Sequence, residues 1–142
     1  MTSWPCTPDP NVDLAIVELS QSANVRAFRT GNDCKLLDEV VVFGYPPIPR
    51  SNDAYLVVNR GEISAKPRLY EDSQEIIVVS CLLRGGNSGG PVVNSRGAVV
   101  GVISRQLFKQ VAPDEKSINE SLGMAAATSA RHLEPLIVNA LA

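Results

Sequence analysis

The chain has 142 residues, of which 44% are hydrophobic and 20% charged, and its formal net charge is -2. This length suits one ordinary domain with its own core, and the composition is typical of a globular protein rather than of a disordered or membrane chain. The slightly acidic balance and the scattered Lys and Arg residues argue against nucleic-acid binding, and no apolar run is long enough to span a membrane.

The N-terminal segment and the cysteines exclude further classes. Residues 1–10 have neither the basic start nor the apolar core of a signal peptide, which leaves the compartment open. Cys6, Cys34 and Cys81 are odd in number, form no Cys-x-x-Cys pair and have no histidines at metal-site spacing. We therefore expect no metal site and no disulfide framework, and we expect Cys81, beside an apolar run, to be a buried small hydrophobe.

Short apolar runs separated by turn residues dominate the sequence, and their length and their Val and Ile content favour strands over helices. The expected strands are 14–19, 36–43, 55–58, 76–83, 91–93, 98–103 and 124–127. Residues 94–97 separate two of them closely enough for a hairpin, and the proline-rich segment 45–49 must be irregular. About six strands between Leu36 and Ala127 are enough for a small antiparallel barrel, and the stretch before Thr30 supplies one more.

Only the C-terminal end has a helical pattern. Residues 129–141 bring their apolar side chains near one face, and Thr128 or Ser129 is the expected N-cap. Because proline is tolerated in the first turn and disruptive later, Pro135 indicates either a start nearer His132 or a kink.

The segment Gly85 to Pro91 reads Gly-Gly-Asn-Ser-Gly-Gly-Pro, which is typical of a nucleophile loop. A serine hydroxyl needs a base to take its proton and donors to hold the charge that forms on the attacked carbonyl. Without side chains to hinder them, Gly85 and Gly86 allow the loop Gly86-Asn87-Ser88 to form an oxyanion hole, with the backbone N–H groups of Gly86 and Ser88 as donors. The alternative interpretation is a glycine-rich turn that contains the serine by chance.

Further motifs extend this pattern along the chain. They are Asp13-Leu14-Ala15-Ile16-Val17, Val42-Phe43-Gly44-Tyr45-Pro46, Asn59-Arg60-Gly61-Glu62-Ile63-Ser64 and the segment 123–128. Together with the nucleophile loop they resemble the trypsin-like serine proteases: the catalytic aspartate motif, the start of the second barrel, its next strand and its last strand. Asn87 stands where secreted animal members carry an aspartate, so the resemblance leans towards the bacterial HtrA/Deg type.

The resemblance implies an all-β fold: a complete second antiparallel β-barrel with a C-terminal α-helix, plus the last strand of the first barrel. Residues 1–33 would then be the remnant of the first barrel and the inter-barrel linker, and residues 34–142 the second barrel with its helix. Leu14, Ile16 and Val17 would lack strand neighbours, so we expect an exposed apolar face, association and poor solubility.

The resemblance also implies a serine-type endopeptidase that hydrolyses polypeptides through an acyl-enzyme on Ser88, without a metal or cofactor. Asp13 would orient the catalytic histidine, and the alternative for Asp13 is a turn residue. The oligomeric state stays open. HtrA/Deg relatives are often exported and often carry a peptide-binding domain after the protease, and neither feature is visible in this sequence.

A histidine that would act as the base between Asp13 and Ser88 is missing. In the family it precedes the aspartate, but no histidine precedes Asp13 here, and the sole imidazole, His132, lies in the C-terminal helical segment. The sequence is therefore interpreted as a fragment from a mis-started or truncated gene, inactive as isolated. The alternatives are a non-catalytic peptide-binding or interaction module, and a separate chain that supplies the histidine.

The resemblance also indicates which residues would determine substrate specificity. If the loop before Ser88 aligns with that of the family, Leu82 would lie at the base of the substrate pocket and Gly123 in a pocket wall. Ser104, Arg105 and Gln106 would form an edge strand that binds the substrate. An apolar base favours a small or medium apolar residue before the scissile bond over Lys or Arg, because nothing offsets the desolvation of their charges. The alternative is that Leu82 is simply part of the core.

Overall fold

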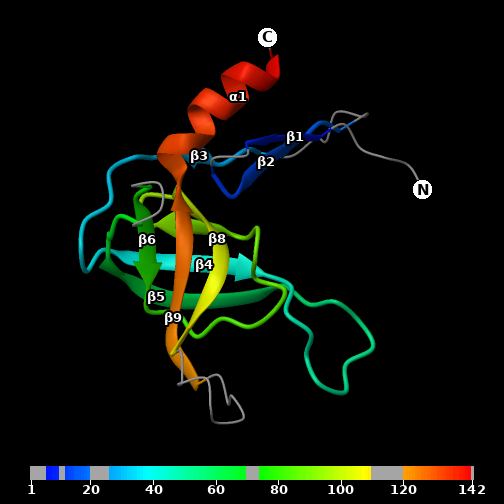
Figure 1. Cartoon of the computed structure of the whole chain (residues 1–142). Coiled ribbons are helices and arrows are strands. Elements are labelled where there is room, and N and C mark those ends of the chain that lie inside the picture. The colour runs from blue at the N-terminus through cyan, green and yellow to red at the C-terminus, as the bar shows by residue number, and fades with distance from the viewer. Residues whose placement is uncertain (1–5, 10–11, 20–25, 70–73, 110–119, 142) are drawn as a thin grey trace, which may run out of the picture.

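The computed structural model describes residues 6–9, 12–19, 26–69, 74–109 and 120–141. Nearly half of these residues belong to β-strands, and one short helix follows the last strand (Figure 1). Among the described helices, none has the length and apolar character needed to cross a membrane.

Six of the described strands close into an antiparallel barrel. They are β4 (Glu39–Gly44), β5 (Val57–Ala65), β6 (Ile76–Val79), β7 (Pro91–Asn94), β8 (Ala98–Lys109) and β9 (Glu120–Ser129). Neighbours follow the order β8-β7-β4-β5-β6-β9, and β9 pairs with β8 to complete the ring. The all-β class, the antiparallel barrel and the C-terminal helix are therefore confirmed.

The core fills the interior of this barrel with small and branched apolar side chains. Strand β6 shows how the sequence provides it: all four residues are buried, with Ile77 and Val79 in the main core. Ile76 and Val78 point to the opposite face and pack in a second cluster with Ala126. A strand buried on both faces reads as a continuous apolar run rather than as an alternation, which is what this segment shows.

Two register shifts bend the long strand β8. Its pairing with β9 slips between Ile103 and Arg105 and again between Gln106 and Phe108. Such bulges add twist and curvature to one strand, so β8 can pair with β7 at its start and with β9 along most of its length. The second half of β8 thereby reaches the region of the nucleophile loop.

The expected strand boundaries hold with local differences. The expected strand 55–58 and the motif 59–64 form one strand, β5. Leu36 and Leu37 form a turn instead of starting β4, because the Asp38 carboxylate accepts a hydrogen bond from the Lys35 amide. The expected hairpin at 94–97 is confirmed: the Gly97 amide donates to the Asn94 carbonyl oxygen at 2.9 Å, and Gly97 has φ 76°.

The N-terminal segment contains more strand than expected. β1 (Cys6–Asp9) pairs antiparallel with β2 (Leu14–Val17), so the expectation that β2 has no strand neighbour is wrong. Pro8 concealed β1 in the sequence, but a two-stranded ladder consists only of edge strands, where proline is accommodated. β3 (Arg29–Thr30) adds a short parallel pairing to β8.

The C-terminal helix begins later than residue 129. A 3-10 turn, η1 (Ala130–His132), leads from β9 into α1 (Leu133–Leu141), and Pro135 lies in the first turn, where its missing N–H is harmless. Leu133 packs beside the cluster of Val93, Val99 and Ala130. The helix also contacts β2, so α1 and the β1–β2 hairpin lie together at one end of the barrel (Figure 1).

We predict that Gly61→Ala lowers the free energy of unfolding by about 1–3 kcal/mol, the usual cost of overpacking a core. The added methyl group would overlap the Cys81 sulfur and come within 2.9 Å of the Ser80 carbonyl oxygen. Gly85→Ala is the control, because nothing lies within 4 Å of the added methyl group. Urea unfolding of both variants checks the prediction, and equal stabilities would contradict this packing.

We also predict that one thiol reacts quickly with a thiol reagent at neutral pH and that all three react after unfolding. Cys6 is exposed, whereas Cys34 and Cys81 are buried. Burial raises the pKa of both buried thiols, so it reduces the reactive thiolate as well as access to it. A colorimetric thiol assay with and without urea measures this, and three fast thiols in the folded protein would contradict it.

Candidate active site

Two glycines with positive φ give the nucleophile loop its shape. Gly86 has φ 99° and Gly89 has φ 81°, values that L-amino acids with a side chain rarely adopt. Gly86 also has no room for a Cβ atom, which would lie 2.6 Å from the Tyr45 carbonyl oxygen. The backbone therefore turns sharply on both sides of Ser88 and presents this side chain at the surface.

Backbone hydrogen bonds hold the loop between β4 and β8. On one side the Tyr45 amide donates to the Gly86 carbonyl oxygen at 3.0 Å. On the other side the Gly89 amide donates to the Ile103 carbonyl oxygen at 2.7 Å, and the Ile103 amide donates to Gly90 at 2.9 Å. The position of Ser88 is thus set by the barrel rather than by contacts of its own side chain.

Asn87 anchors the loop from inside. It is 2% exposed, and both its backbone amide and its side-chain amide donate to the Arg84 carbonyl oxygen, at 3.2 and 2.9 Å. Its backbone N–H is therefore engaged within the loop, so Asn87 contributes position rather than a donor to the expected oxyanion hole. Its Oδ1 atom is buried without a hydrogen-bond partner in the described part of the chain.

The Ser88 side chain is exposed to solvent, and two backbone amides of the same loop are close to it in the sequence. Its Oγ atom donates to the Ser104 carbonyl oxygen at 3.2 Å. Within the residues that the structure describes, the backbone amides of Gly86 and Ser88 make no hydrogen bond. Amides without a partner near an exposed hydroxyl are what an oxyanion hole requires, so the role expected for Gly86 and Ser88 stays a prediction.

Asp13 faces the same pocket as Ser88. It lies in the turn before β2, and together with Leu14, Ser104 and Leu133 it lines a pocket of about 420 Å³ that also reaches Ser88. The β1–β2 hairpin and the start of α1 thus bring the acidic side chain to the nucleophile loop from a distant part of the sequence.

His132 does not line any of the described pockets that include Ser88. It ends η1, and its pKa is lowered by burial and by the neighbouring Arg131 charge. Its Nε2 atom accepts a hydrogen bond from the Arg131 Nε–H group at 3.5 Å. Among the described residues, no group of three or more His, Cys, Asp or Glu side chains is arranged to hold a metal ion.

A second pocket at Ser88, about 310 Å³ in volume, contains the expected edge strand. Ser104, Arg105 and Gln106 of β8 line it together with Leu83 and Phe108. The Gln106 side-chain amide donates to the Ser121 hydroxyl at 2.6 Å, which fixes this side chain against β9. The pocket has an apolar side, and this part of β8 pairs with β9 but has no β7 partner beyond Val102. An extended peptide could pair with such a strand.

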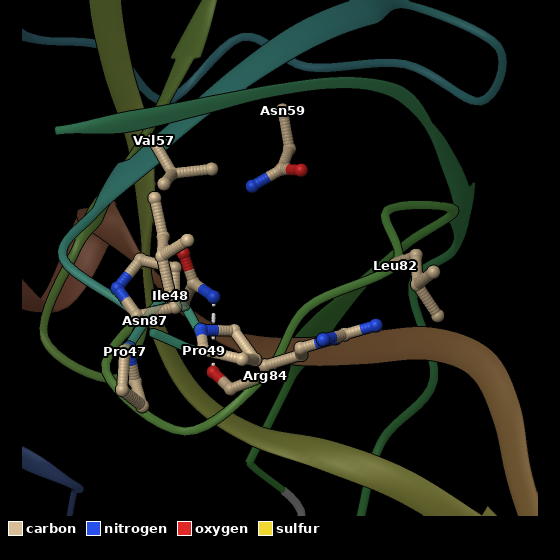
Figure 2. Close-up of a pocket in the computed structure, with 9 residues that line it drawn as sticks. Pro47, Ile48, Pro49, Val57, Asn59, Leu82, Arg84 and Asn87 are labelled. Atoms are coloured by element: carbon tan, nitrogen blue, oxygen red, sulfur yellow. Dashed lines mark hydrogen bonds between the residues drawn. The ribbon is translucent and has the colours of Figure 1, made fainter. Parts of the chain in front are cut away.

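Leu82 and Gly123 are not among the residues that line this pocket. Leu82 is 62% exposed, so it is not part of the core either. It lines a different pocket of about 320 Å³ between the nucleophile loop and the β4–β5 connection (Figure 2). We call this the proline pocket, after Pro46, Pro47 and Pro49 in its wall.

The sequence reasoning missed Leu83 and Phe108. Burial alternates from Ser80 to Leu83, with Cys81 and Leu83 inward and Leu82 outward. The period-two alternation of a strand, counted from the buried Cys81, would have indicated Leu83 as an inward-facing residue. Phe108 had no such signal, because two bulges decide which side chains of β8 face the pocket.

Comparisons with known proteins identify the family of this fold. Residues 4–102, which are more than half of the chain, match the model of the trypsin-like peptidase domain. The chain is 33% identical over 98 residues to a probable periplasmic serine endoprotease, DegP-like, of Chlamydia pneumoniae, covering 66% of this chain and 19% of that protein. It is 32% identical over 101 residues to the uncharacterized protein y4bJ of Sinorhizobium fredii, covering 70% of this chain and 15% of the relative.

Solved structures share the fold. The HtrA-type protease AlgW, solved with a decapeptide, superimposes with a TM-score of 0.70 at 23% identity, covering 94% of this chain and 39% of that one. Rv3671c from M. tuberculosis, solved as a mutant in its inactive form, gives 0.65 at 20% identity, covering 94% and 62%. The chain spans less than a fifth of the curated relatives that it matches.

The barrel, the glycine-shaped loop around Ser88 and the matched family model lead to one conclusion: this chain belongs to the trypsin-like peptidase family and is similar to its bacterial HtrA-type members.

Proposed function

We propose that this chain carries the nucleophile, the oxyanion hole and the orienting carboxylate of a serine endopeptidase. The observation that supports this most is the convergence at one pocket of Ser88, with two unengaged amides beside it, and Asp13 from the distant N-terminal hairpin. A glycine-rich turn that held a serine by chance would not need an acidic side chain brought to it.

The proposed reaction begins with transfer of the Ser88 hydroxyl proton to an imidazole. The Ser88 oxygen then bonds to the substrate carbonyl carbon, and the backbone amides of Gly86 and Ser88 hold the oxyanion that forms. The imidazolium returns the proton to the leaving amine, and water later releases the acyl group from Ser88. The Ser88–Ser104 hydrogen bond of the free chain would have to break first.

The imidazole in this proposal comes from outside residues 1–142. The sequence contains one histidine, and His132 lines none of the described pockets at Ser88. The pocket of about 420 Å³ between Asp13 and Ser88 has room for an imidazole ring from another part of a longer polypeptide or from a separate chain. Asp13 would hold that ring in the tautomer that accepts the Ser88 proton.

The proposed substrate is an extended polypeptide along β8. Ser104, Arg105 and Gln106 would pair with its backbone, and the pocket with Leu83 and Phe108 would take an apolar side chain. The AlgW structure with its decapeptide supports a polypeptide as the ligand class.

A second candidate is a peptide-binding module without catalysis. It is favoured by the contact of the Ser88 hydroxyl with the Ser104 main chain, where an active serine would contact its base. The two candidates share the peptide-binding strand and differ in the chemistry of Ser88.

We predict that a fluorophosphonate probe labels Ser88 slowly in plain buffer and at least about tenfold faster with added imidazole, because general-base catalysis contributes about 10²–10⁴-fold. Only neutral imidazole accepts the proton, so the rate should rise with pH as the added imidazolium loses its proton near neutral pH. Mass spectrometry of the labelled peptide measures the rate.

Two variants control this experiment. Ser88→Ala should remove the label, and Asp13→Asn should reduce the gain from imidazole while leaving the slow rate in plain buffer unchanged. Labelling at another residue, or a labelling rate that does not change with imidazole or pH, would contradict the endopeptidase proposal. Peptide binding that persisted without labelling would favour the binding module.

We further predict that Gly86→Ala lowers the imidazole-dependent labelling rate about 10²–10³-fold, the usual cost of losing one oxyanion donor. The added methyl group would meet the Tyr45 carbonyl oxygen at 2.6 Å and the Pro46 Cα atom at 2.7 Å, so the Gly86 amide must move. Thermal melting checks that the variant folds. A folded variant labelled as fast as the parent would show that this amide does not hold the oxyanion.

A further inference from the structure

The proline pocket has the features of a small-ligand site beside the catalytic pockets, and it shares Arg84 and Asn87 with the pocket that Ser104, Arg105 and Gln106 line. Its volume of about 320 Å³ is at the lower end of the range of about 300–1,000 Å³ for ligand sites, which suits one or two amino-acid residues. Neither Ser88, nor Asp13, nor any residue of β8 lines it. Its walls come from residues 46–49, Val57 and Asn59 of β5, and the segment from Leu82 to Asn87 (Figure 2).

The walls are apolar and pre-formed. Three of the four residues from 46 to 49 are prolines, whose fixed φ angles limit how far this wall can rearrange. Leu82 and Ile48 are 62% and 44% exposed, so apolar surface at the pocket is in contact with water. An apolar side chain of a ligand would cover it at little cost in ordering the protein.

The pocket carries one charge, and it is positive. Figure 2 shows the Arg84 side chain extending along one side of the pocket toward Leu82, with the Asn59 amide on the opposite side, on β5. Arg84 forms no ion pair among the described residues, and no acidic residue lines the pocket. A guanidinium group binds a carboxylate with two parallel hydrogen bonds, and a side-chain amide can pair with a peptide group.

We propose that the proline pocket binds the C-terminal end of a peptide whose last side chain is apolar. The free carboxylate pairs with Arg84, the last side chain lies against the prolines and Leu82, and the preceding peptide group reaches the Asn59 amide. Peptide hydrolysis releases such C-terminal ends, so the ligand is of the product class of the proposed reaction. This last link, unlike the binding itself, rests on the proposed function.

The occupied pocket would act on the nucleophile loop through its backbone. The Arg84 carbonyl oxygen accepts both hydrogen bonds from Asn87, and the Gly86 carbonyl oxygen accepts one from Tyr45, next to the proline wall. A ligand held by Arg84 and the wall would therefore restrain the turn that carries the amide of Gly86.

The test uses the isotope-labelled Ser88→Ala chain, so that no peptide is cleaved and the result does not depend on catalysis. N-acetylvalylleucine, with a free carboxylate, and its C-terminal amide are titrated while NMR follows backbone and side-chain amides. We expect saturable shifts at Asn59, Leu82 and Asn87 with the acid, and binding of the amide about threefold to fivefold weaker, as loss of an exposed charge-assisted pair implies.

Two further variants locate the contact. Arg84→Gln should weaken binding of the acid about threefold to fivefold and leave binding of the amide unchanged, whereas Arg96→Gln, on the hairpin between β7 and β8, should change neither. Equal binding of acid and amide, shifts confined to Ser104 and Gln106, or no saturable binding at all would overturn the proposal. Failure of the Ser88 labelling experiment would leave this result untouched.

Discussion

The backbone clamp on the nucleophile loop is the constraint on which the rest of the structure depends. Tyr45 at the end of β4 holds Gly86, and Ile103 in β8 holds Gly89 and Gly90, so two strands of the closed barrel fix both ends of a short turn. The positive φ values and the close approach to Tyr45 make glycine necessary at residue 86. Ser88 needs no partner of its own to be placed, and a nucleophile can therefore point outward while the protein stays folded.

The barrel supplies the clamp because it is closed. Bulges in β8 let that strand pair with β7 and then with β9, and the same bend carries Ser104, Arg105 and Gln106 past Ser88. The N-terminal hairpin and α1 complete the arrangement at one end of the barrel, where Asp13 reaches the pocket. Fold and proposed chemistry thus rest on the same hydrogen bonds, and Arg84 and the buried Asn87 line both the pocket at Ser88 and the proline pocket.

The sequence predicted those features that depend on local residue type. The glycines beside Ser88 and at residue 97 permit turns with positive φ, and the Ile and Val run of β6 favours a strand. All three features appear in the structure. The sequence predictions were wrong where tertiary packing decides between alternatives. Pro8 argued against the strand β1, and Leu37 lies in a turn despite its apolar side chain. Leu82 is exposed and Leu83 is buried, an alternation that could have been counted from Cys81. Phe108 was out of reach, because bulges have no sequence signal of their own.

The central claim is that the amides of Gly86 and Ser88 form a pre-arranged oxyanion hole. The most direct measurement is a crystal structure of the chain phosphonylated at Ser88, whose phosphonyl oxygen mimics the oxyanion. The account predicts that this oxygen accepts hydrogen bonds from both amides, at about 2.7–3.1 Å, with the loop backbone unmoved. A phosphonyl oxygen that pointed to solvent, or a loop that had to turn its Gly86 amide to reach it, would contradict the account.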